Sequence, residues 1–294
     1  MKFVHEPDPR GVLYVVATPL GNLDDLSPRA RAVLGCVELI AAEDTRVARH
    51  LLQALGLPQV PTISSFEGNE ARRAEELVSR LSAGAAVALL TDAGTPCVSD
   101  PGDRTVAAAR AAGARIIPIP GPSAVAAALS ISGFPASRFH FEGFLPARGK
   151  ERTIRLTEIS TMSVTVVLYE SPHRIRETLH DLAEACGGSR ECVLCRELTK
   201  KFETIRCAPL GDLDRDSSES EIRGEFTLVL APAPRQAEKP QFPALEKEIS
   251  RLRELGLPVK TVAAVLAPYA GISRSEVYDI ILKFEKDQGK LQGE

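Results

Sequence analysis

Short apolar runs alternate with helical patterns through residues 12–120, and this alternation constrains the fold more than any other feature of the sequence. Two parallel strands need a crossover connection, usually a helix, to carry the chain back to the start of the next strand. The alternation therefore predicts an α/β fold whose mainly parallel sheet is covered on both faces. The expected strands are residues 12–18, 37–43, 62–66, 86–92 and 115–120.

A second α/β unit is expected after residues 120–122, where the alternation pauses at Pro-Gly-Pro. Its later strands follow one another without long helices between them, so this sheet is expected to be mixed. The segment 214–224 predicts a polar loop or hairpin connection, and the proline-rich segment 231–243 is typical of a linker. The expected strands are residues 138–144, 163–169, 190–197, 202–208 and 225–231.

Three helix starts are marked by capping residues. Ser27 followed by Pro28 is typical of an N-cap and a first-turn proline. Thr45 is expected to cap the helix after the second strand, and Ser273 with Glu276 forms an S-x-x-E capping box in the tail.

The tail from residue 244 to the end is helical in pattern and near neutral in charge. Two short helices joined at a glycine resemble a helix-turn-helix. A small helical cap that packs on the body or on a second subunit accounts for the same pattern, so both interpretations stay open. One face of the last helix is expected to hold Val277, Ile280, Ile281 and Phe284.

The length of the chain predicts more than one domain, because 294 residues exceed the usual domain size of roughly 100–200 residues. We expect an N-terminal α/β domain at 1–119, a second α/β domain at 120–233 and a C-terminal helical module at 244–294.

The charge balance limits the kinds of partner. A net charge of -3 excludes a strongly cationic coat, so any nucleic-acid binding must use local basic patches. Residues 1–10 lack the apolar run of about 7–15 residues of a secretory signal, and no apolar stretch reaches the ~18 residues of a membrane helix. A cytoplasmic protein without membrane contact is expected.

The six cysteines are scattered and favour free thiols over a disulfide framework. Cys192 and Cys195 form a C-x-x-C, but no second pair or histidine cluster stands at ligand spacing. Both lie in an expected buried strand, where positions i and i+3 face opposite ways. Core cysteines are therefore expected here, and no metal site is predicted.

Three loops that follow strands are rich in glycine, proline and small residues: 17–22, 91–102 and 120–124. In open α/β sheets ligands bind beyond the carboxyl ends of strands, and glycine lets the backbone approach them closely. The chain has no G-x-G-x-x-G after its first strand and no phosphate-binding P-loop. The loops therefore predict a crevice for a small polar ligand and leave its identity open.

Eight motifs appear in order along the chain: ATPLGNLDDLSPRA, AAEDTRVARHLL, LLTDAGTPCVSDPG, PIPGPSAVAAALSISGFP, FHFEGFLP, YESPHRI, CRELTKKFET and GEFTLVL. Together they closely resemble the ribosomal RNA small-subunit methyltransferase I family, the cytidine-2′-O-methyltransferases of the tetrapyrrole-methylase superfamily. The resemblance runs from about residue 12 to the end, since the tail resembles the family's C-terminal helix-turn-helix module.

The resemblance implies S-adenosylmethionine-dependent methylation of the 2′-hydroxyl of a cytidine in small-subunit (16S) ribosomal RNA. It implies two α/β domains of the tetrapyrrole-methylase fold, with the cofactor folded in the cleft between them, and a homodimer. Carried over motif by motif, the expected cofactor-binding residues are Leu20, Gly21, Asp92, Gly94, Thr95, Val98, Ser123, Ala124, Tyr169 and Glu225.

A general base is expected to help the reaction, because a ribose hydroxyl is a poor nucleophile while it keeps its proton. Such a base contributes about 10²–10⁴-fold to the rate. Asp44 is the leading candidate, since AEDTR ends a strand in the direction of the crevice. The other candidates are Glu43, Glu170, His173 and Glu197.

Structural roles compete with the catalytic ones. Asp44 also suits support of the helix cap at Thr45, and His173 suits a helix start that contacts backbone or RNA phosphate. Glu197, beside Arg196 and Lys200, also suits a solvated ion-pair cluster.

Basic residues recur just after the expected strands and are candidates for RNA contacts, although a solvated surface charge is the commoner fate of each. Phosphate contacts predict steeply salt-dependent binding of rRNA or the small ribosomal subunit. The group comprises Arg46, Arg49, His50, Arg148, Lys150, Arg152, His173, Arg174, Arg176, Lys200 and Lys201.

Two other functions stay open. Another enzyme of the superfamily, acting on a corrin, a sirohaem precursor or a diphthine-type protein substrate, would share the fold, but such enzymes lack this set of motifs and this tail. A non-enzymatic nucleic-acid binder would use the tail alone, and the near-balanced charge of the tail weighs against it.

Overall fold

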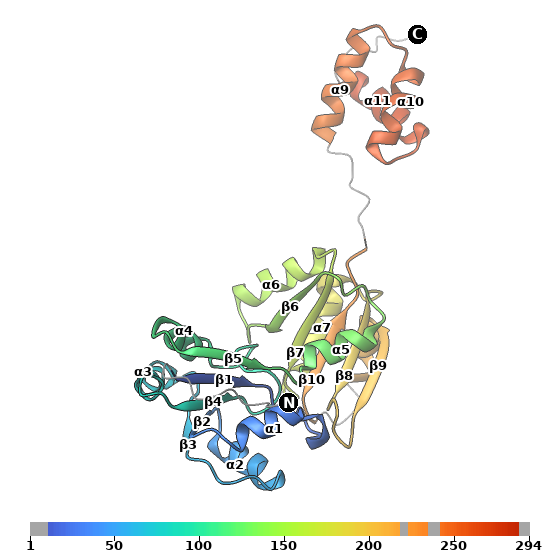
Figure 1. Cartoon of the computed structure of the whole chain (residues 1–294). Helices are drawn as coiled ribbons and strands as arrows, with labels where there is room; N and C mark the ends of the chain where they lie inside the picture. Colours follow the sequence, from blue (N-terminus) through green and yellow to red (C-terminus); the bar gives the residue numbers. More distant parts are fainter. Residues whose placement is uncertain (1–10, 218–222, 235–241, 288–294) are drawn as a thin grey trace. The chain divides into compact units, whose positions relative to one another are not determined.

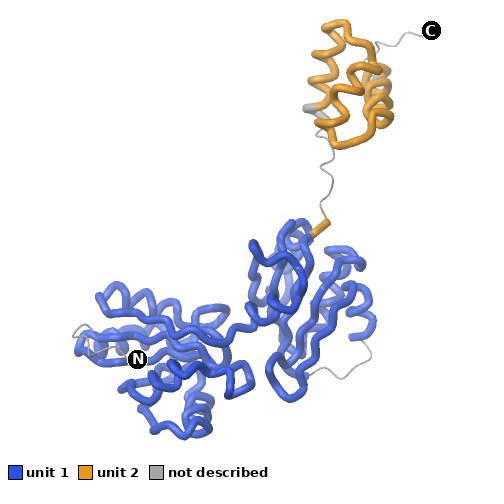
Figure 2. The backbone as a smooth tube through the Cα atoms, turned by 45° about the vertical axis from the view of Figure 1, so that its right-hand side comes forward, with its two compact units in different colours: residues 1–232 blue, residues 233–294 orange. Residues whose placement is uncertain are grey.

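The computed structural model describes residues 11–217, 223–234 and 242–287. The chain divides into two compact units, residues 1–232 and 233–294, which Figure 2 colours separately. Within the described ranges, no helix combines the length and the apolar character that a membrane crossing requires.

The first sheet has the strand order β3-β2-β4-β1-β5, and all its pairs are parallel (Figure 1). The predicted parallel sheet is confirmed. Its strands are β1 (Val12–Val16), β2 (Leu39–Ala42), β3 (Thr62–Ser64), β4 (Ala86–Leu90) and β5 (Arg115–Ile119). The connecting helices are α1 (Pro28–Leu34), α2 (Thr45–Ala54), α3 (Glu70–Ser82) and α4 (Asp103–Ala111).

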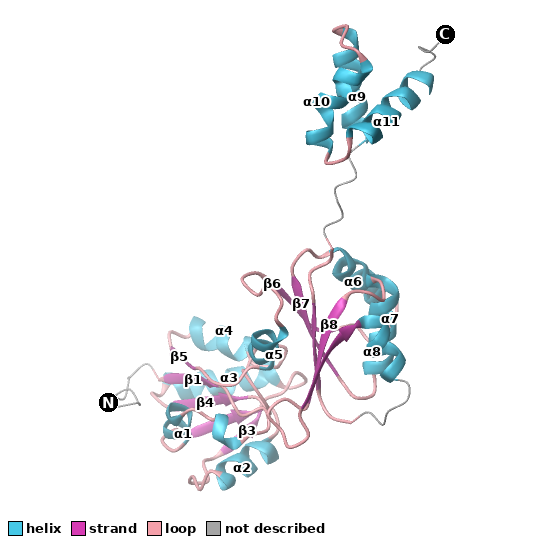
Figure 3. Ribbon diagram, turned by 90° about the vertical axis from the view of Figure 1, so that its right-hand side faces the viewer, coloured by secondary structure: helices cyan, strands magenta, loops and turns pink. Residues whose placement is uncertain are grey.

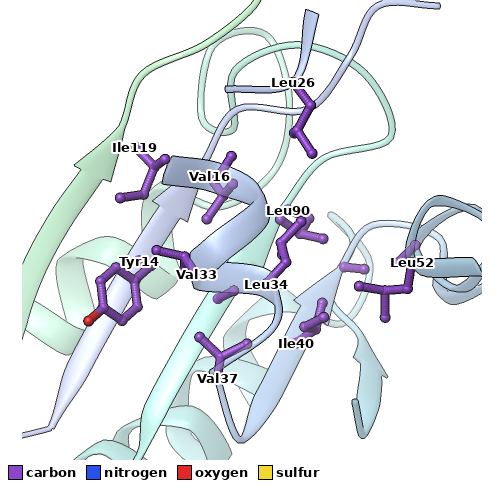
Figure 4. Close-up of a cluster of buried hydrophobic side chains, with 14 of the residues drawn as sticks. Tyr14, Val16, Leu26, Val33, Leu34, Val37, Ile40, Leu52, Leu90 and Ile119 are labelled. Atoms are coloured by element: carbon purple, nitrogen blue, oxygen red, sulfur yellow. The ribbon is translucent and has the colours of Figure 1, made fainter. Parts of the chain in front are cut away.

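Helices cover both faces of this sheet because its strands are apolar on both sides. One buried cluster joins Tyr14 and Val16 of β1 to α1 and α2 (Figure 4). Leu13, which points to the opposite face, packs with Leu77 of α3 and Ala109 of α4. The near-continuous apolar runs in the sequence follow from this two-sided burial.

The second sheet has the strand order β6-β7-β10-β8-β9, in which β6 and β7 are parallel and the other pairs antiparallel. The predicted mixed sheet is confirmed. Its strands are β6 (Phe139–Phe144), β7 (Thr165–Glu170), β8 (Glu191–Arg196), β9 (Thr204–Pro209) and β10 (Phe226–Leu230).

Helices α6 (Lys150–Thr161), α7 (Ile175–Cys186) and α8 (Leu210–Ser217) lie along one side of this sheet (Figure 3), and α5 (Ala124–Ser132) packs on the other. The expected polar loop at 214–224 is wrong for its first residues, which belong to α8. Leu210 and Leu213, three positions apart, are both buried, so the apolar spacing there is helical. Residues 218–222 of that prediction lie outside the described residues.

The capping predictions are confirmed at Ser27, which accepts a hydrogen bond from the Ala30 N–H at 3.0 Å, but not at Thr45. The N-cap of α2 is Asp44, whose carboxylate accepts from the Arg46 N–H at 2.8 Å. The cap lies one residue earlier than expected because Thr45 already has helical geometry.

The two core cysteines behave as predicted. Cys192 and Cys195 are fully buried and belong to clusters on opposite faces of the second sheet. They therefore do not form a joint metal or redox pair.

The described residues of the second unit form three helices, α9 (Phe242–Glu254), α10 (Val259–Ala270) and α11 (Arg274–Asp287), around a small core of their own. Gly271 ends α10 with a left-handed φ of 66°. The capping box is confirmed, since the Glu276 carboxylate accepts from the Ser273 N–H at 2.9 Å. Val277 and Ile281 are fully buried, with Ile280 and Phe284 packed beside them. Of the expected linker 231–243, residues 235–241 lie outside the described residues.

Candidate active site

A cavity of about 400 Å³ lies within the first unit, beyond the carboxyl ends of β1, β2 and β4, against β7 and the start of β10. This is the edge at which open α/β sheets bind ligands. Gly21 is not part of the cavity wall. The wall contains the other residues that the resemblance assigns to the cofactor: Leu20, Asp92, Gly94, Thr95, Val98, Ser123, Ala124, Tyr169 and Glu225.

The loop 91–102 forms one side of the cavity and is tied to the loop after β1. Thr18 N–H donates to Gly94 O at 2.8 Å, and Gly94 N–H donates back to Thr18 O at 3.1 Å. Gly94 has a φ of +84°, and a Cβ there would lie 3.3 Å from the Leu20 side chain. Cys97 and Ser99 also have positive φ values, of 67° and 66°. Backbone strain of this kind clusters at functional sites.

The loop before α5 closes the adjacent wall. Thr95 Oγ1 donates to the Pro122 carbonyl at 3.1 Å, which joins this loop to the loop 91–102. Ser123 caps α5 and accepts from the Ala126 N–H at 3.5 Å. The cap fixes Ser123 and Ala124 in the cavity wall.

The second sheet contributes an aromatic wall. The Tyr169 ring lies edge-on to the rings of Phe141 and Phe144, with centroid separations of 5.0 and 5.7 Å. Burial raises the pKa of the Tyr169 phenol to about 12, so the phenol is neutral at pH 7. The wall therefore offers apolar ring surface to a ligand.

Glu170 follows Tyr169 and is held rigidly. Its side chain is fully buried, accepts from Ser171 N–H at 2.8 Å and Thr178 Oγ1 at 2.7 Å, and lies 3.4 Å from Arg174. A carboxylate with these partners has its negative charge satisfied inside the fold. Glu170 therefore lines the cavity with both carboxylate oxygens already engaged by other groups of the protein.

Four further acidic side chains border the cavity: Glu43, Asp92, Asp100 and Glu225. Thr91 Oγ1 donates to Glu43 Oε2 at 2.8 Å. Burial raises the pKa of Asp92, and it raises the pKa of Asp100 to about 6. This concentration of negative charge suits a positively charged ligand.

The chain is similar in sequence to proteins named as methyltransferases. Residues 12–214 match the family of tetrapyrrole (corrin/porphyrin) methylases. The ribosomal RNA small subunit methyltransferase I of Pseudomonas aeruginosa is 45% identical over 277 residues, which cover 93% of this chain and 97% of that protein. The protein of the same name from Escherichia coli O157:H7 is 42% identical over 93% of this chain and 96% of its own length. The chain belongs to the ribosomal RNA small subunit methyltransferase I family. It is a methyltransferase.

Solved structures of more distant enzymes share the fold of this methyltransferase. A cobalt precorrin-4 methyltransferase superposes with a TM-score of 0.59 at 18% identity, covering 78% of this chain and 97% of its own. A diphthine synthase superposes with a TM-score of 0.59 at 15% identity, covering 75% and 90%. The tetrapyrrole-methylase fold is thereby confirmed, and at such identities the likeness concerns the fold alone.

Gly21 of the methyltransferase lies against the Lys200 side chain and does not line the cavity. A Cβ at Gly21 would lie 2.2 Å from Lys200 Cγ, so the glycine permits this close approach. Lys200 Nζ in turn lies 2.9 Å from Glu197 Oε1 and 3.0 Å from Glu225 Oε2. Lys200 and Glu197, predicted as an RNA contact and a base, form the ion-pair cluster that the sequence also allowed.

The candidates for the general base differ in their position relative to the cavity. Glu43 lies in the cavity wall, whereas Asp44 and His173 do not. Asp44 caps α2 and forms an ion pair with Arg46 at 2.5 Å, and the Arg46 hydrogen bonds lower its pKa to about 2. His173 is exposed in the turn before α7. The assignment of the base to Asp44 stays a prediction, against which its position and its pKa both weigh.

The basic residues predicted to contact RNA fall into an exposed group and a group that is bound inside the protein. Arg46 and Arg49 share a shallow hollow on α2 with His50, and Arg148 and Lys150 are exposed. By contrast, three predicted RNA contacts make internal hydrogen bonds. Arg152 donates to Asp181 at 2.7 Å, Arg174 to the Leu145 carbonyl at 2.6 Å and Arg176 to the Ser217 carbonyl at 2.9 Å.

Asp100 lines the cavity but was not predicted as a site residue. It belongs to the loop 91–102, where an aspartate before Pro-Gly is an ordinary turn residue. Its half-buried position depends on the left-handed residues Cys97 and Ser99 before it. Nothing in the sequence pattern marks those two residues as left-handed, because neither is a glycine.

Proposed function

We propose that this methyltransferase transfers the methyl group of S-adenosylmethionine to the 2′-hydroxyl of a cytidine in small-subunit (16S) ribosomal RNA. The observation that carries the proposal is the meeting of three small-residue loops and an aromatic wall at one cavity, in a chain whose relatives are named for ribosomal RNA. Cytidine and the 2′-oxygen come from the family resemblance.

The cavity fits the cofactor in chemical character. Its volume lies within the range of about 300–1,000 Å³ typical of small-molecule sites. Leu20, Val98 and Phe144 supply apolar surface for a nucleoside, and Asp92 and Asp100 supply negative charge for its cationic groups. The bound cofactor would supply an electrophilic methyl group on a sulfonium.

The protein's main contribution to such a transfer is alignment, because oxygen, methyl carbon and sulfur must be in line. Positioning of this kind contributes roughly 7–11 kcal/mol. The hydrogen bonds that tie Gly94 to Thr18 and Thr95 to Pro122 hold the cofactor loops in fixed geometry before any ligand arrives.

RNA phosphates are expected on the exposed cations of the first unit. Arg46 and Arg49 on α2, Arg148 just before α6 and Lys150 at the start of α6 are exposed, and their positive charges are available to phosphate. The homodimer and an RNA-binding role for the helix-turn-helix-like tail remain proposals from the resemblance. The three predicted domains remain proposals from the sequence pattern.

The decisive experiment maps ribose methylation in small-subunit rRNA from cells with and without the gene, with reconstitution by the purified protein. Labelled S-adenosylmethionine is incubated with small subunits from the deletion strain or with a tetrapyrrole precursor. Label in a cytidine 2′-O-methyl group of the RNA supports the proposal. Label in the tetrapyrrole alone, or no difference between the two strains, overturns it.

A further inference from the structure

A second cavity, of about 310 Å³, adjoins the cavity of the candidate active site, which we call the cofactor cavity. It lies between the loop after β1 and the helix α2, and we call it the α2 cavity. Leu20, Thr91, Asp92 and Ala93 border both cavities, so they form a shared wall. A group bound in the α2 cavity would therefore be adjacent to the cofactor.

The α2 cavity is lined largely by apolar side chains. Val47, Leu51 and Ala54 recur at helical spacing and therefore occupy one face of α2. Leu23, in the short 3₁₀ helix Leu23–Asp25, adds to this lining. Leu23 is 44% exposed and Val47 is 38% exposed, although both are large apolar residues. A concave site with apolar walls and few polar groups is typical of ligand binding.

Cations lie next to the α2 cavity. Arg46, Arg49 and His50 border the shallow hollow on α2, which we call the basic hollow. His50 lines the α2 cavity as well, so the hollow and the cavity adjoin. The molecule thus has three sites in a fixed order, namely the cofactor cavity, the apolar α2 cavity and the basic hollow.

A nucleotide of single-stranded RNA carries chemical groups that suit this order. Proteins that read single-stranded RNA bind bases that are splayed out of the stack, and cations bind the phosphates. A ribose at the shared wall would present its hydroxyl toward the cofactor, with the base in the α2 cavity and a flanking phosphate at the basic hollow. The charges favour this side of the cofactor cavity over the side of β7, where Arg152 and Arg174 donate to internal acceptors.

We propose that the α2 cavity binds the nucleobase of the substrate nucleotide and that the basic hollow binds a flanking phosphate. This inference rests on the proposed 2′-O-methylation and adds to it the place where the substrate base lies. Leu23, Val47 and Leu51 contact the ring of the base. His50 lies at the junction between the base and the phosphate.

The first test observes binding without activity. Full-length protein with ¹³C-labelled leucine and valine methyl groups is saturated with S-adenosylhomocysteine, so that the cofactor cavity is occupied. It is then titrated with cytidine 5′-monophosphate. We expect the methyl signals of Leu23, Val47 and Leu51 to shift in the NMR spectrum. Ribose 5-phosphate, which has the phosphate but no base, should leave these three signals in place.

Shifts with cytidine 5′-monophosphate and none with ribose 5-phosphate support the inference. Shifts that appear only when S-adenosylhomocysteine is left out mean that the nucleotide competes for the cofactor cavity, and they overturn it. Shifts of the three signals with both probes, or with neither, overturn it as well, because the base would then make no contact of its own.

The second test fills the α2 cavity. Val47→Trp places an indole where the base is expected. One extra methylene in a hydrophobic pocket changes specificity roughly 10–200-fold, so kcat/KM for undermethylated small subunits should fall by about tenfold or more. The Kd of S-adenosylmethionine from calorimetry should stay within a few-fold of the wild-type value, which shows that the variant folds. Val47→Ala leaves the cavity open and should keep most of the rate.

The matched control is Ile131→Trp on α5, where the side chain is 47% exposed and lines neither the cofactor cavity nor the α2 cavity. It should keep the wild-type kcat/KM. A Val47→Trp enzyme with the wild-type kcat/KM overturns the inference. A lower oligomeric state of Val47→Trp in light scattering also overturns it, because the α2 cavity would then be an interface between copies. A wild-type enzyme that leaves rRNA unmethylated instead overturns the proposed function itself, so the two failures are distinguishable.

Discussion

Two segments leave the same edge of the first sheet and use their acidic residues in opposite ways. After β2, Glu43 is followed by Asp44, which caps a regular helix and pairs with Arg46. After β4, the chain makes a loop with left-handed residues at Cys97 and Ser99 and presents Asp100 to the cavity. The pKa values follow the settings: hydrogen bonds from Arg46 lower that of Asp44, and burial raises that of Asp100.

The difference shows that a position after a strand does not define a chemical role. A carboxylate whose lone pairs are satisfied by a helix start is stabilised in its ionised form and is a weak base. A carboxylate held in a strained, half-buried loop among like charges keeps an affinity for protons. The left-handed conformations of Cys97 and Ser99 are the backbone strain that accompanies the position of Asp100 in the cavity wall.

Gly94→Val alters the loop 91–102 and should have the largest effect on ligand binding of the substitutions compared. The left-handed φ of +84° costs a side chain about 1–2 kcal/mol, and the branched Cβ would start 3.3 Å from Leu20 in the cavity wall. We expect S-adenosylmethionine binding, measured by calorimetry, to weaken by about tenfold or more, since 1.4 kcal/mol corresponds to tenfold.

The matched control is Gly56→Val, just after α2, where φ is +64° and, apart from its chain neighbours, no described residue lies within 4 Å of the added Cβ. It should lower thermal stability to a similar extent and leave cofactor affinity unchanged. Equal weakening of cofactor binding in both variants would show that the loop 91–102 has no special relation to the ligand.

Asp44→Asn sharpens the comparison between the two carboxyl groups. Asparagine caps helices about as well as aspartate, so α2 should persist. We expect kcat to change by less than about tenfold, whereas loss of a general base costs about 10²-fold or more. Initial rates of methylation at saturating S-adenosylmethionine measure this effect. A larger loss with an unchanged cofactor Kd would support the role of base for Asp44.

The strand alternation and the loops after the strands could be predicted from the sequence because they follow from apolar periodicity and from turn chemistry. The same reasoning placed the loops 17–22, 91–102 and 120–124 near a ligand. The family resemblance named Leu20, Gly94 and Ser123 within them, and these three residues line the cavity. Gly21 is adjacent to Leu20 in the sequence, yet it faces Lys200, because a loop turns successive residues in different directions.

The choice between acidic neighbours could not be predicted in this way. Glu43 and Asp44 are adjacent in the sequence. Because α2 begins at Thr45, Asp44 becomes its N-cap, whereas Glu43 accepts a hydrogen bond from Thr91. The cations pose the same difficulty. Arg49 and Arg174 both follow strand motifs, but Arg174 is bound to the Leu145 carbonyl beside a buried glutamate that no local pattern reveals.

Arg49→Gln tests the surface that α2 exposes, and its effect should be the smallest. Arg49 is exposed and, among the described residues, its side-chain hydrogen bond is the one to Thr45 at 3.2 Å, so its charge is available to RNA phosphate. Loss of one phosphate contact should reduce the slope of log Kobs against log salt by about 0.7–0.9. Arg174→Gln should leave that slope unchanged and instead cost roughly 1–3 kcal/mol of stability, because it removes a partner of buried Glu170. If Arg174→Gln changes the slope and Arg49→Gln does not, the RNA lies on the side of β7 and not along α2, since counterion release reports only the cations that touch phosphate.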